Sequence, residues 1–419
     1  MANILYLVHR IPFPPNKGDK LRSYHMLRHL AQRHRVFLGS FVDDPRDAMH
    51  EPTVRAMCAD LYLAKLRPAL ARLRSLRGLV SGQALSLAYY RDAGLKDWVT
   101  RTLEGHAIDV IVVFSSPMAQ YAFAPSQRVA PPVVIDFVDV DSAKWTQYGA
   151  LRRGPLGWLY RREGARLLDW ERLAATRARR SLFVTESEAE LFRGLAPESA
   201  ASVDALGNGV DTDYFSPDPA RASPFRPVAM QADRIPIVFT GAMDYWPNID
   251  AVTWFVHDIL PRLCRAWPRL CLYIVGGGPP ASVLALASAQ VTVTGRVDDI
   301  RPWLQHAAVV VAPMRVARGV QNKILEAMAM ARPVVATKSC VQAIGACDGQ
   351  ELIAASGAHG FAREIDALLR DPLQAAAIGQ AARRRVLANG SWAAQLQGID
   401  PHIDGSAPQP RTVRELPCP

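Results

Sequence analysis

Lysine is scarce in this sequence. Of its 49 Lys and Arg residues only seven are lysine, and beyond Lys144 only Lys323 and Lys338 remain. An arginine bias of this kind more often reflects genome base composition than function, so it excludes no class of protein. It does make the position of each remaining lysine worth explaining.

Paired cysteines and long apolar runs are also missing. The six cysteines are scattered, with no CxxC pair and no tight His/Cys cluster, which argues against zinc and thioredoxin-like sites. No stretch approaches the roughly 18 apolar residues of a spanning helix. The apolar run 4–8 is interrupted by His9-Arg10, too early for a signal-peptide core. These absences predict a cytoplasmic protein, soluble or peripheral on the inner face of the plasma membrane.

The charge is distributed unevenly along the chain. The formal net charge is +10, with 29 basic and 21 acidic residues in 1–210 (+8) but 20 and 18 in 211–419 (+2). Such an excess suggests nucleic acid, a phosphorylated ligand or an anionic membrane as partner. With 419 residues, 49% hydrophobic and 21% charged, the sequence predicts two to three globular domains.

Short apolar runs alternate with helical patterns in both halves, which is typical of βα units and parallel sheets. We expect strands at residues 4–8, 36–41, 109–114, 133–135, 181–184 and 201–206, and then at 236–240, 270–275, 291–294, 308–311, 334–336 and 351–354. Residues 217–232, rich in Pro, Ala and Arg, are the best linker candidate. The predicted fold class is α/β, with two Rossmann-like doubly wound domains facing across a cleft.

The segment 315–337 is the most informative for chemistry. Gly319 lies at a turn between a buried strand and a helix, where backbone N–H groups can approach a phosphate. Lys323 and Glu326 share one face of that helix and would suit the phosphate and the ribose hydroxyls of a nucleotide. A surface Lys–Glu pair on an ordinary helix explains the spacing equally well. The Gly276-Gly277-Gly278 run lacks GxGxxG spacing, which argues against a nicotinamide enzyme.

Two further groups lie in the N-terminal half. Gly18 precedes a helix, so Asp19, Lys20 and Arg22 are candidate ligand contacts, although Asp19 could simply stabilise the helix dipole. Asp136, Asp139 and Asp141 follow a predicted strand, where they could bind donor or acceptor sugar, cap a helix or hold a divalent metal. Each of these alternatives stays open from the residues alone.

Arginine is concentrated in residues 152–180, which contain nine arginines interleaved with Trp158, Tyr160 and Trp170. On a helix this pattern suits an anionic membrane surface, and residues 65–77 have the same character. A solvated helix face with snorkelling arginines is the alternative. Nucleic-acid binding would use similar charge, but no recognised module accompanies it.

Several motifs in order resemble family 4 glycosyltransferases. Segment 315–337 is similar to their donor motif, in which two glutamates precede a Pro-Val-Val strand. The other landmarks are Asn208-Gly209-Val210-Asp211, Phe239-Thr240-Gly241 with Pro247-Asn248, Val275-Gly276-Gly277-Gly278-Pro279 and Val293-Thr294-Gly295-Arg296-Val297. The resemblance covers almost the whole chain. It implies the glycosyltransferase B (GT-B) fold and a hexosyltransferase that uses a nucleotide-sugar donor, retains anomeric configuration and needs no metal or other cofactor.

The N-terminal motifs narrow the resemblance. Residues 9–24, 114–121 and 136–145 look like those of the sugar transferases associated with bacterial exosortase/PEP-CTERM exopolysaccharide loci. That subgroup implies transfer from a UDP- or GDP-sugar to a hydroxyl of a growing, lipid-linked or oligosaccharide acceptor. A nucleotide-sugar epimerase of similar shape, a basic nucleic-acid-binding protein and a non-catalytic scaffold are the alternatives.

The chain departs from the family at two places. Arg318 stands where the family has its first Glu, which puts the identity or orientation of the donor sugar in doubt. The loop 241–246 also lacks the family's Arg and Lys, so Arg315 and Lys323 are expected to offset the charge of the leaving diphosphate.

These patterns predict the following site and domains. The catalytic candidates are Asp19, Asp139, Asp141 and Lys323. The donor-binding candidates are Gly18, Gly241, Gly276, Gly278, Arg315, Gly319, Val320, Gln321, Lys323 and Glu326. We expect an acceptor-side domain at 1–207, a donor domain at 208–388, a C-terminal helix at 389–404 that could pack back on the first domain, and a disordered tail at 405–419. Membrane contact is expected through residues 152–180, with no nucleic-acid partner.

Overall fold

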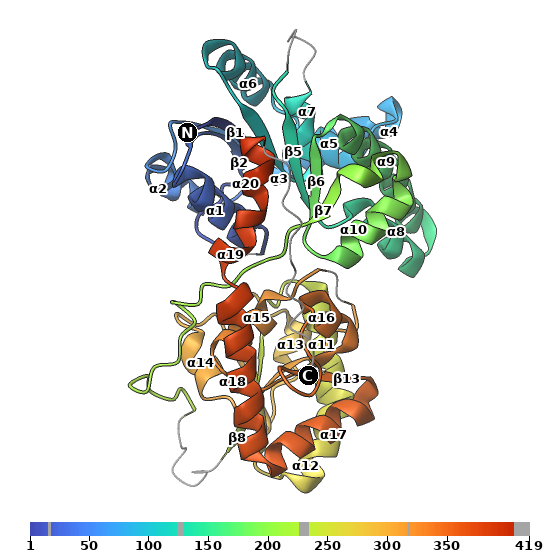
Figure 1. Cartoon of the computed structure of the whole chain (residues 1–419). Helices are drawn as coiled ribbons and strands as arrows, with labels where there is room; N and C mark the ends of the chain where they lie inside the picture. The colour runs from blue at the N-terminus through green and yellow to red at the C-terminus, as the bar shows by residue number, and fades with distance from the viewer. Residues whose placement is uncertain (16–17, 124–129, 226–233, 317–318, 406–419) are drawn as a thin grey trace. The chain divides into compact units, whose positions relative to one another are not determined.

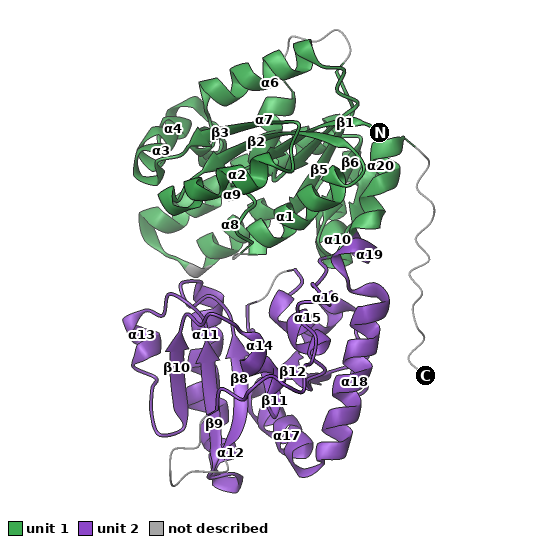
Figure 2. Cartoon of the chain, turned by 90° about the vertical axis from the view of Figure 1, so that its left-hand side faces the viewer, with its two compact units in different colours: residues 1–207, 396–413 green, residues 208–395, 414–419 purple. Residues whose placement is uncertain are grey.

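The structure is a computed structural model that describes residues 1–15, 18–123, 130–225, 234–316 and 319–405. The chain divides into two compact units (Figure 2). Residues 1–207 and the segment that starts at Leu396 form unit 1, and residues 208–395 form unit 2. The first division falls between residues 207 and 208.

Unit 1 is built around a parallel sheet of seven strands in the order β3-β2-β1-β4-β5-β6-β7 (Figure 1). The strands are β1 Asn3–Val8, β2 Arg35–Val42, β3 Asp60–Lys65, β4 Val110–Phe114, β5 Val133–Val138, β6 Arg180–Phe183 and β7 Val203–Ala205. The helices are α1 Gly18–Ala31, α2 Glu51–Arg55, α3 Pro68–Ser75, α4 Arg77–Ser81, α5 Leu85–Tyr89, α6 Ala93–Gly105, α7 Ala119–Ala122, α8 Asp141–Leu151, α9 Gly154–Arg177, α10 Glu186–Leu195 and α20 Asp400–Asp404.

Unit 2 also has a parallel sheet, with six strands in the order β10-β9-β8-β11-β12-β13. The strands are β8 Ile235–Thr240, β9 Leu270–Val275, β10 Val291–Gly295, β11 Val309–Ala312, β12 Val334–Thr337 and β13 Ile353–Ala355. The helices are α11 Trp246–Trp254, α12 Leu260–Ala266, α13 Ala281–Leu284, α14 Arg301–Gln305, α15 Asn322–Ala329, α16 Lys338–Ile344, α17 Gly357–Arg370, α18 Pro372–Asn389 and α19 Trp392–Leu396.

Both sheets have the strand order of doubly wound nucleotide-binding folds, which confirms the predicted fold class. The interior strands β4 of unit 1 and β9 of unit 2 are buried along their whole length, as expected for strands covered by helices on both faces. The order of each sheet reverses between its first and fourth strands, β1 and β4 in unit 1 and β8 and β11 in unit 2. Ligands bind such sheets at the carboxyl ends of the strands on either side of this reversal.

The proline-rich stretch predicted to be a linker belongs to unit 2 over its described part. The backbone N–H of Asp218 donates to Gln305 Oε1 at 3.0 Å, which ties this stretch to α14. The linker prediction is therefore wrong for residues 217–225, and residues 226–232 lie outside the described residues. Among the described residues, no helix is long and apolar enough to span a membrane.

The segment that returns to unit 1 is held by ion pairs. Asp400 at the start of α20 lies 2.6 Å from His29 Nε2 and 2.6 Å from Arg33, both near the C-terminal end of α1. Figure 1 shows α20 beside α1 accordingly. The predicted tail, residues 405–419, lies outside the described residues except for Gly405.

Candidate functional site

Two glycine turns pack backbone to backbone at the sheet edge of unit 2. Gly241 follows β8 and Gly276 follows β9. A Cβ atom on Gly276 would lie 1.8 Å from the carbonyl oxygen of Gly241, so only glycine fits there. Gly278, two residues on, has φ +72°, a conformation that favours glycine. These glycines keep the carboxyl ends of β8 and β9 free of side chains.

Lys323, in the first turn of α15, lies next to this edge. Its Nζ donates to Asn248 Oδ1 at 2.7 Å and lies 4.2 Å from the centre of the Phe239 ring. A Cβ atom on Gly241 would come within 3.0 Å of the same Nζ. No carboxylate forms a salt bridge with Lys323 in the described part of the chain, and burial lowers its pKa to about 7.

Asn248 holds this lysine in place. Its side chain is buried on α11, donates from Nδ2 to the Ala242 carbonyl at 2.8 Å and accepts from Lys323 through Oδ1. The sequence motifs mark Asn248 only as a family landmark. The spacing of 75 residues between the partners gives no signal of their pairing.

Glu326 lies one turn further along α15. Burial raises the pKa of its carboxyl group to about 7, and no hydrogen bond to that group is found among the described residues. The site therefore combines a lysine and a glutamate whose charged forms are both disfavoured by burial. An anionic ligand with hydroxyl groups would reverse this, since phosphate favours the ammonium form and hydroxyls can donate to a carboxylate.

The loop before α15 turns at Gly319, which has φ +64°. Val320 and Gln321 follow, and the backbone of Gln321 is extended before the helix begins at Asn322. The first N–H groups of a helix have no intrahelical acceptor, so this N-terminus can attract an anion. Arg318, at the position of the family's first Glu, lies outside the described residues.

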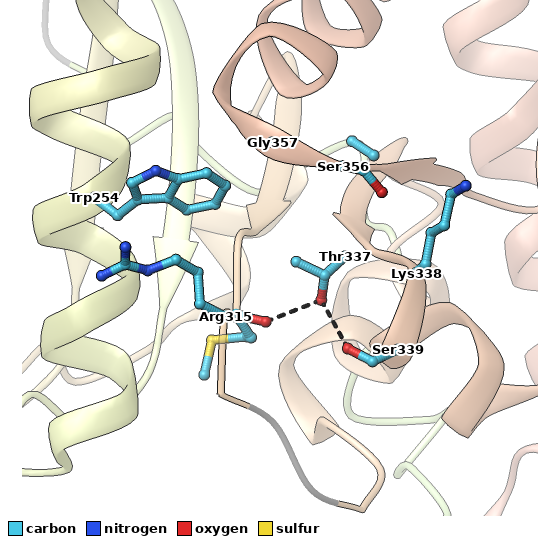
Figure 3. Close-up of a pocket in the computed structure, with 9 residues that line it drawn as sticks. Trp254, Arg315, Thr337, Lys338, Ser339, Ser356 and Gly357 are labelled. Atoms are coloured by element: carbon cyan, nitrogen blue, oxygen red, sulfur yellow. Dashed lines mark hydrogen bonds between the residues drawn. The ribbon is translucent and has the colours of Figure 1, made fainter. Parts of the chain in front are cut away.

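Arg315 is engaged by a carboxylate. It pairs with both oxygens of Asp250 on α11, with an Nε–Oδ2 distance of 3.0 Å, and its guanidinium lies 5.5 Å from the centre of the Trp254 ring. Figure 3 shows Arg315 and Trp254 along one side of a cavity, whose volume is about 390 Å³. Thr337, Lys338 and Ser356 line the other side, where Thr337 Oγ1 donates to the Met314 carbonyl at 3.1 Å.

In unit 1, Asp19 lies in a cluster of charges at the end of β1. It accepts from Arg10 at 2.8 Å and lies 3.3 Å from His9 Nε2. Burial works against ionisation of Asp19, but these two partners outweigh it and hold the pKa of the carboxyl well below its usual range. Arg10 also pairs with Asp43 at 2.7 Å. Gly18 begins α1 beside this cluster, and a Cβ atom there would meet open space.

The sequence motifs quote His9 as part of a resemblance without giving it a role. Its ring stacks on Phe114 at 5.6 Å between centres, and its Nδ1 lies 3.4 Å from Ser115 Oγ. These contacts place an imidazole at the reversal of strand order in unit 1, between the ends of β1 and β4. Only the sheet order, which brings residues 9 and 115 together, reveals this position.

The three aspartates predicted to follow a strand have different surroundings. Asp136 lies inside β5, and only Asp139 and Asp141 come after the strand. Asp136 is fully buried and paired with Arg22 at 2.7 Å, so both side chains are structural. Asp139 and Asp141 share the ammonium group of Lys144 at 2.7 and 3.1 Å. One oxygen of Asp139, Oδ1, is buried without a hydrogen-bond partner in the described part of the chain.

Lys20, the remaining predicted contact, is 2% exposed and pairs with Asp47 at 2.5 Å. This structural ion pair takes up its charge. The described residues contain no group of three or more His, Cys, Asp or Glu side chains that could hold a metal ion.

Comparison with known proteins finds a family match in unit 2 and curated relatives of part of the chain. Residues 234–371 match the family model described as glycosyl transferases group 1. A curated relative, the GDP-mannose-dependent alpha-(1-6)-phosphatidylinositol monomannoside mannosyltransferase of Mycolicibacterium smegmatis, is 29% identical over 46% of this chain and 54% of its own length. A D-inositol 3-phosphate glycosyltransferase of Kribbella flavida is 28% identical over 52% and 54%. The chain thus spans about half the length of the curated relatives it matches.

Among solved structures, Anabaena Alr3699/HepE in complex with UDP and glucose has a TM-score of 0.69 at 17% identity, covering 97% of this chain and all of that one. This likeness concerns the fold. The chain therefore has the two-unit GT-B fold, and residues 234–371 of its second unit match the glycosyl transferases group 1 family.

Proposed function

We propose that this protein is a hexosyltransferase that moves a sugar from a nucleoside-diphosphate donor to a hydroxyl group of a lipid-linked glycan, at the cytoplasmic side of a membrane. The observation that carries the proposal is Lys323. It is a half-buried lysine with no carboxylate partner among the described residues, placed by Asn248 over a glycine-lined sheet edge inside the matched segment. A diphosphate supplies the negative charge that this lysine lacks.

The donor would lie along the carboxyl ends of β8 and β11. Lys323 and the N-terminus of α15 would receive the diphosphate, and Glu326 would accept hydrogen bonds from ribose hydroxyls. Arg315 could contribute only by sharing its charge with Asp250. A UDP- or GDP-sugar fits the comparisons, because one relative is named for GDP-mannose and one structural neighbour contains UDP.

The proposed reaction retains the configuration at the anomeric carbon. The bond from that carbon to the diphosphate oxygen breaks while a bond to the acceptor oxygen forms on the same face. The acceptor proton passes to the departing diphosphate, whose charge Lys323 offsets. This path needs no protein carboxylate as nucleophile and no metal. Asp19 of unit 1 is therefore not required as a nucleophile, and its carboxylate is already paired with Arg10 and held ionised.

Unit 1 would bind the acceptor. His9, positioned by Asp19 and Phe114, follows β1, and Asp139 follows β5, the second strand along from β1 in the sheet. One buried oxygen of Asp139 has no hydrogen-bond partner among the described residues, so both side chains could bind acceptor hydroxyls. The resemblance to exosortase-associated transferases suggests that this acceptor belongs to a growing exopolysaccharide.

Calorimetry with UDP, GDP and ADP, and then with their sugar conjugates, tests the donor site. We expect one nucleotide series to bind, and Lys323→Ala to weaken binding by about 10- to 100-fold, as for the loss of one charge-assisted contact. Leu373→Ala, an exposed change elsewhere in unit 2, is the control. Unchanged affinity and turnover in Lys323→Ala would contradict the proposal. Incubation with donor alone separates the epimerase alternative, which would interconvert the sugar without acceptor.

A further inference from the structure

The helical segment α3–α4 presents large apolar side chains to solvent. Leu70, Leu73, Leu76, Leu79 and Val80 are 37–95% exposed, with Val80 at 95%. Single exposed apolar side chains are common on protein surfaces, but five large ones within eleven consecutive residues concentrate apolar area on one short segment. We call this apolar area, with the basic residues around it, the α3–α4 surface.

This segment exposes its large apolar side chains and buries its small ones, the opposite of an ordinary surface helix. Its inward positions are Ala71, Ser75 and Gly78, which recur at helical spacing and are buried. A surface helix normally buries its large apolar side chains and exposes small or polar ones. Here the small residues allow close packing on unit 1, and the leucines remain outside.

The α3–α4 surface is strongly basic. Residues 61–91 contain six Lys and Arg residues and no Asp or Glu. Four of the arginines flank the leucines and are exposed, namely Arg67, Arg72, Arg74 and Arg77. An acid-free basic rim around an apolar patch fits a partner that offers both negative charge and hydrocarbon.

The N-terminal end of α9 extends the same surface. Arg162 donates to the carbonyl oxygen of Gly78 at 2.7 Å, and Glu163 accepts from the Leu85 N–H at 2.7 Å. The first bond ties α9 to α4 and the second ties it to the start of α5, and Figure 1 shows these helices together. Leu156 and Trp158, four to six residues before Arg162, are 42% and 56% exposed. Arg152 and Arg153 are exposed next to them.

We propose that the α3–α4 surface, together with the first turns of α9, docks on an anionic lipid bilayer. The leucines would insert among the acyl chains while the arginines contact lipid phosphates. A second copy of the chain fits less well, since a two-fold contact would oppose the same arginines. Nucleic acid would leave the leucines without partners. The inference deepens the proposed function, because a lipid-linked acceptor is met at such a bilayer.

This assignment moves the predicted membrane contact. Residues 152–180 contribute through their first turns only, since further along α9 Arg166 pairs with Asp169 and Arg172 pairs with Glu198. The centre of the surface lies instead in residues 67–80.

Co-sedimentation with vesicles tests the proposal on the full chain. Vesicles of phosphatidylcholine with about 30% phosphatidylglycerol are compared with pure phosphatidylcholine at low and high salt. We expect wild type to bind only the anionic vesicles, and the triple variant Leu73→Ser, Leu76→Ser, Val80→Ser to bind them at least about tenfold more weakly. A variant with Arg72, Arg74 and Arg77 changed to Gln should lose the preference for anionic lipid.

The matched control is Leu373→Ser with Leu387→Ser, two exposed leucines on α18 of unit 2, which should bind vesicles as wild type does. Equal binding of the triple variant and wild type, or no vesicle binding at all, would overturn the proposal. So would a wild-type dimer that the triple variant abolishes. Nucleotide binding measured on the same proteins separates the two proposals, because a failed donor site leaves vesicle binding intact.

Discussion

The pKa of Lys323 gives the donor site a distinctive dependence on pH. With a pKa of about 7, the lysine in the empty site is half protonated at pH 7 and about one-hundredth protonated at pH 9. If a nucleoside diphosphate binds the ammonium form, its affinity should fall about 50-fold between these values, or about 2.3 kcal/mol. An ordinary lysine, with a pKa near 10.4, would give almost no change over this range.

Calorimetry of UDP or GDP binding at pH 7, 8 and 9 measures this fall directly. Because the ligand raises the pKa of the lysine, binding at pH 8 should also take up nearly one proton, which appears as a dependence of the binding enthalpy on the buffer. Lys323→Arg keeps a cation that does not titrate, so the part of the pH dependence that comes from this lysine should disappear.

Glu326 titrates in the same range, since its pKa is raised to about 7, and its ionisation above pH 7 adds a carboxylate beside the ligand. The series is therefore repeated with Glu326→Gln, which removes that titration and keeps the shape of the side chain. Affinity that stays constant from pH 7 to 9 in Glu326→Gln would refute the reasoning. A fall that persists in Glu326→Gln with Lys323→Arg would refute it as well.

Three further predictions concern the fold. Burial raises the pKa of Glu171 to about 8 in the folded protein. Protonation of Glu171 therefore stabilises the fold fully below about pH 4.5, and this stabilisation is lost as pH rises through 8. Glu171→Gln cannot ionise, so it should raise Tm more at pH 8 than at pH 5. Gly276→Ala should unfold or distort the β8–β9 edge and abolish nucleotide binding, whereas Gly277→Ala, where a Cβ atom would meet its nearest neighbour at 3.6 Å, should bind normally. Asp136→Asn leaves the Arg22 guanidinium buried without its counter-charge, so we expect the free energy of unfolding, measured with denaturant, to fall by on the order of 3–5 kcal/mol. Asp169→Asn, which changes an exposed carboxylate, is the control and should leave this free energy nearly unchanged.

The sequence predicts the sheets well because most of their strands are buried on both faces. All twelve expected strands are present, and β9 coincides with its predicted range. Strand β3, Asp60–Lys65, was not predicted. It lies at the edge of its sheet, is only partly buried and runs into an arginine-rich helix, so its pattern lacks the continuous apolar run of the others.

The site is predicted in part. Motifs locate Lys323 and Glu326 on one helix, because local spacing decides which residues share a helix face. They do not reveal that Asn248 holds Lys323, that Asp250 engages Arg315, or that Asp136 pairs with Arg22 across 114 residues. Those contacts follow from the order of the strands, which brings distant segments to one edge.

The discontinuity of unit 1 has a consequence for synthesis. Its first strand leaves the ribosome before unit 2, yet the segment from Leu396, with Asp400 between His29 and Arg33, emerges only after residues 208–395 of unit 2. Domains usually fold as units during synthesis, N-terminal first. Here the N-terminal unit remains without one of its helices until unit 2 has been translated, so the nascent chain carries an unfinished N-terminal unit through most of its elongation.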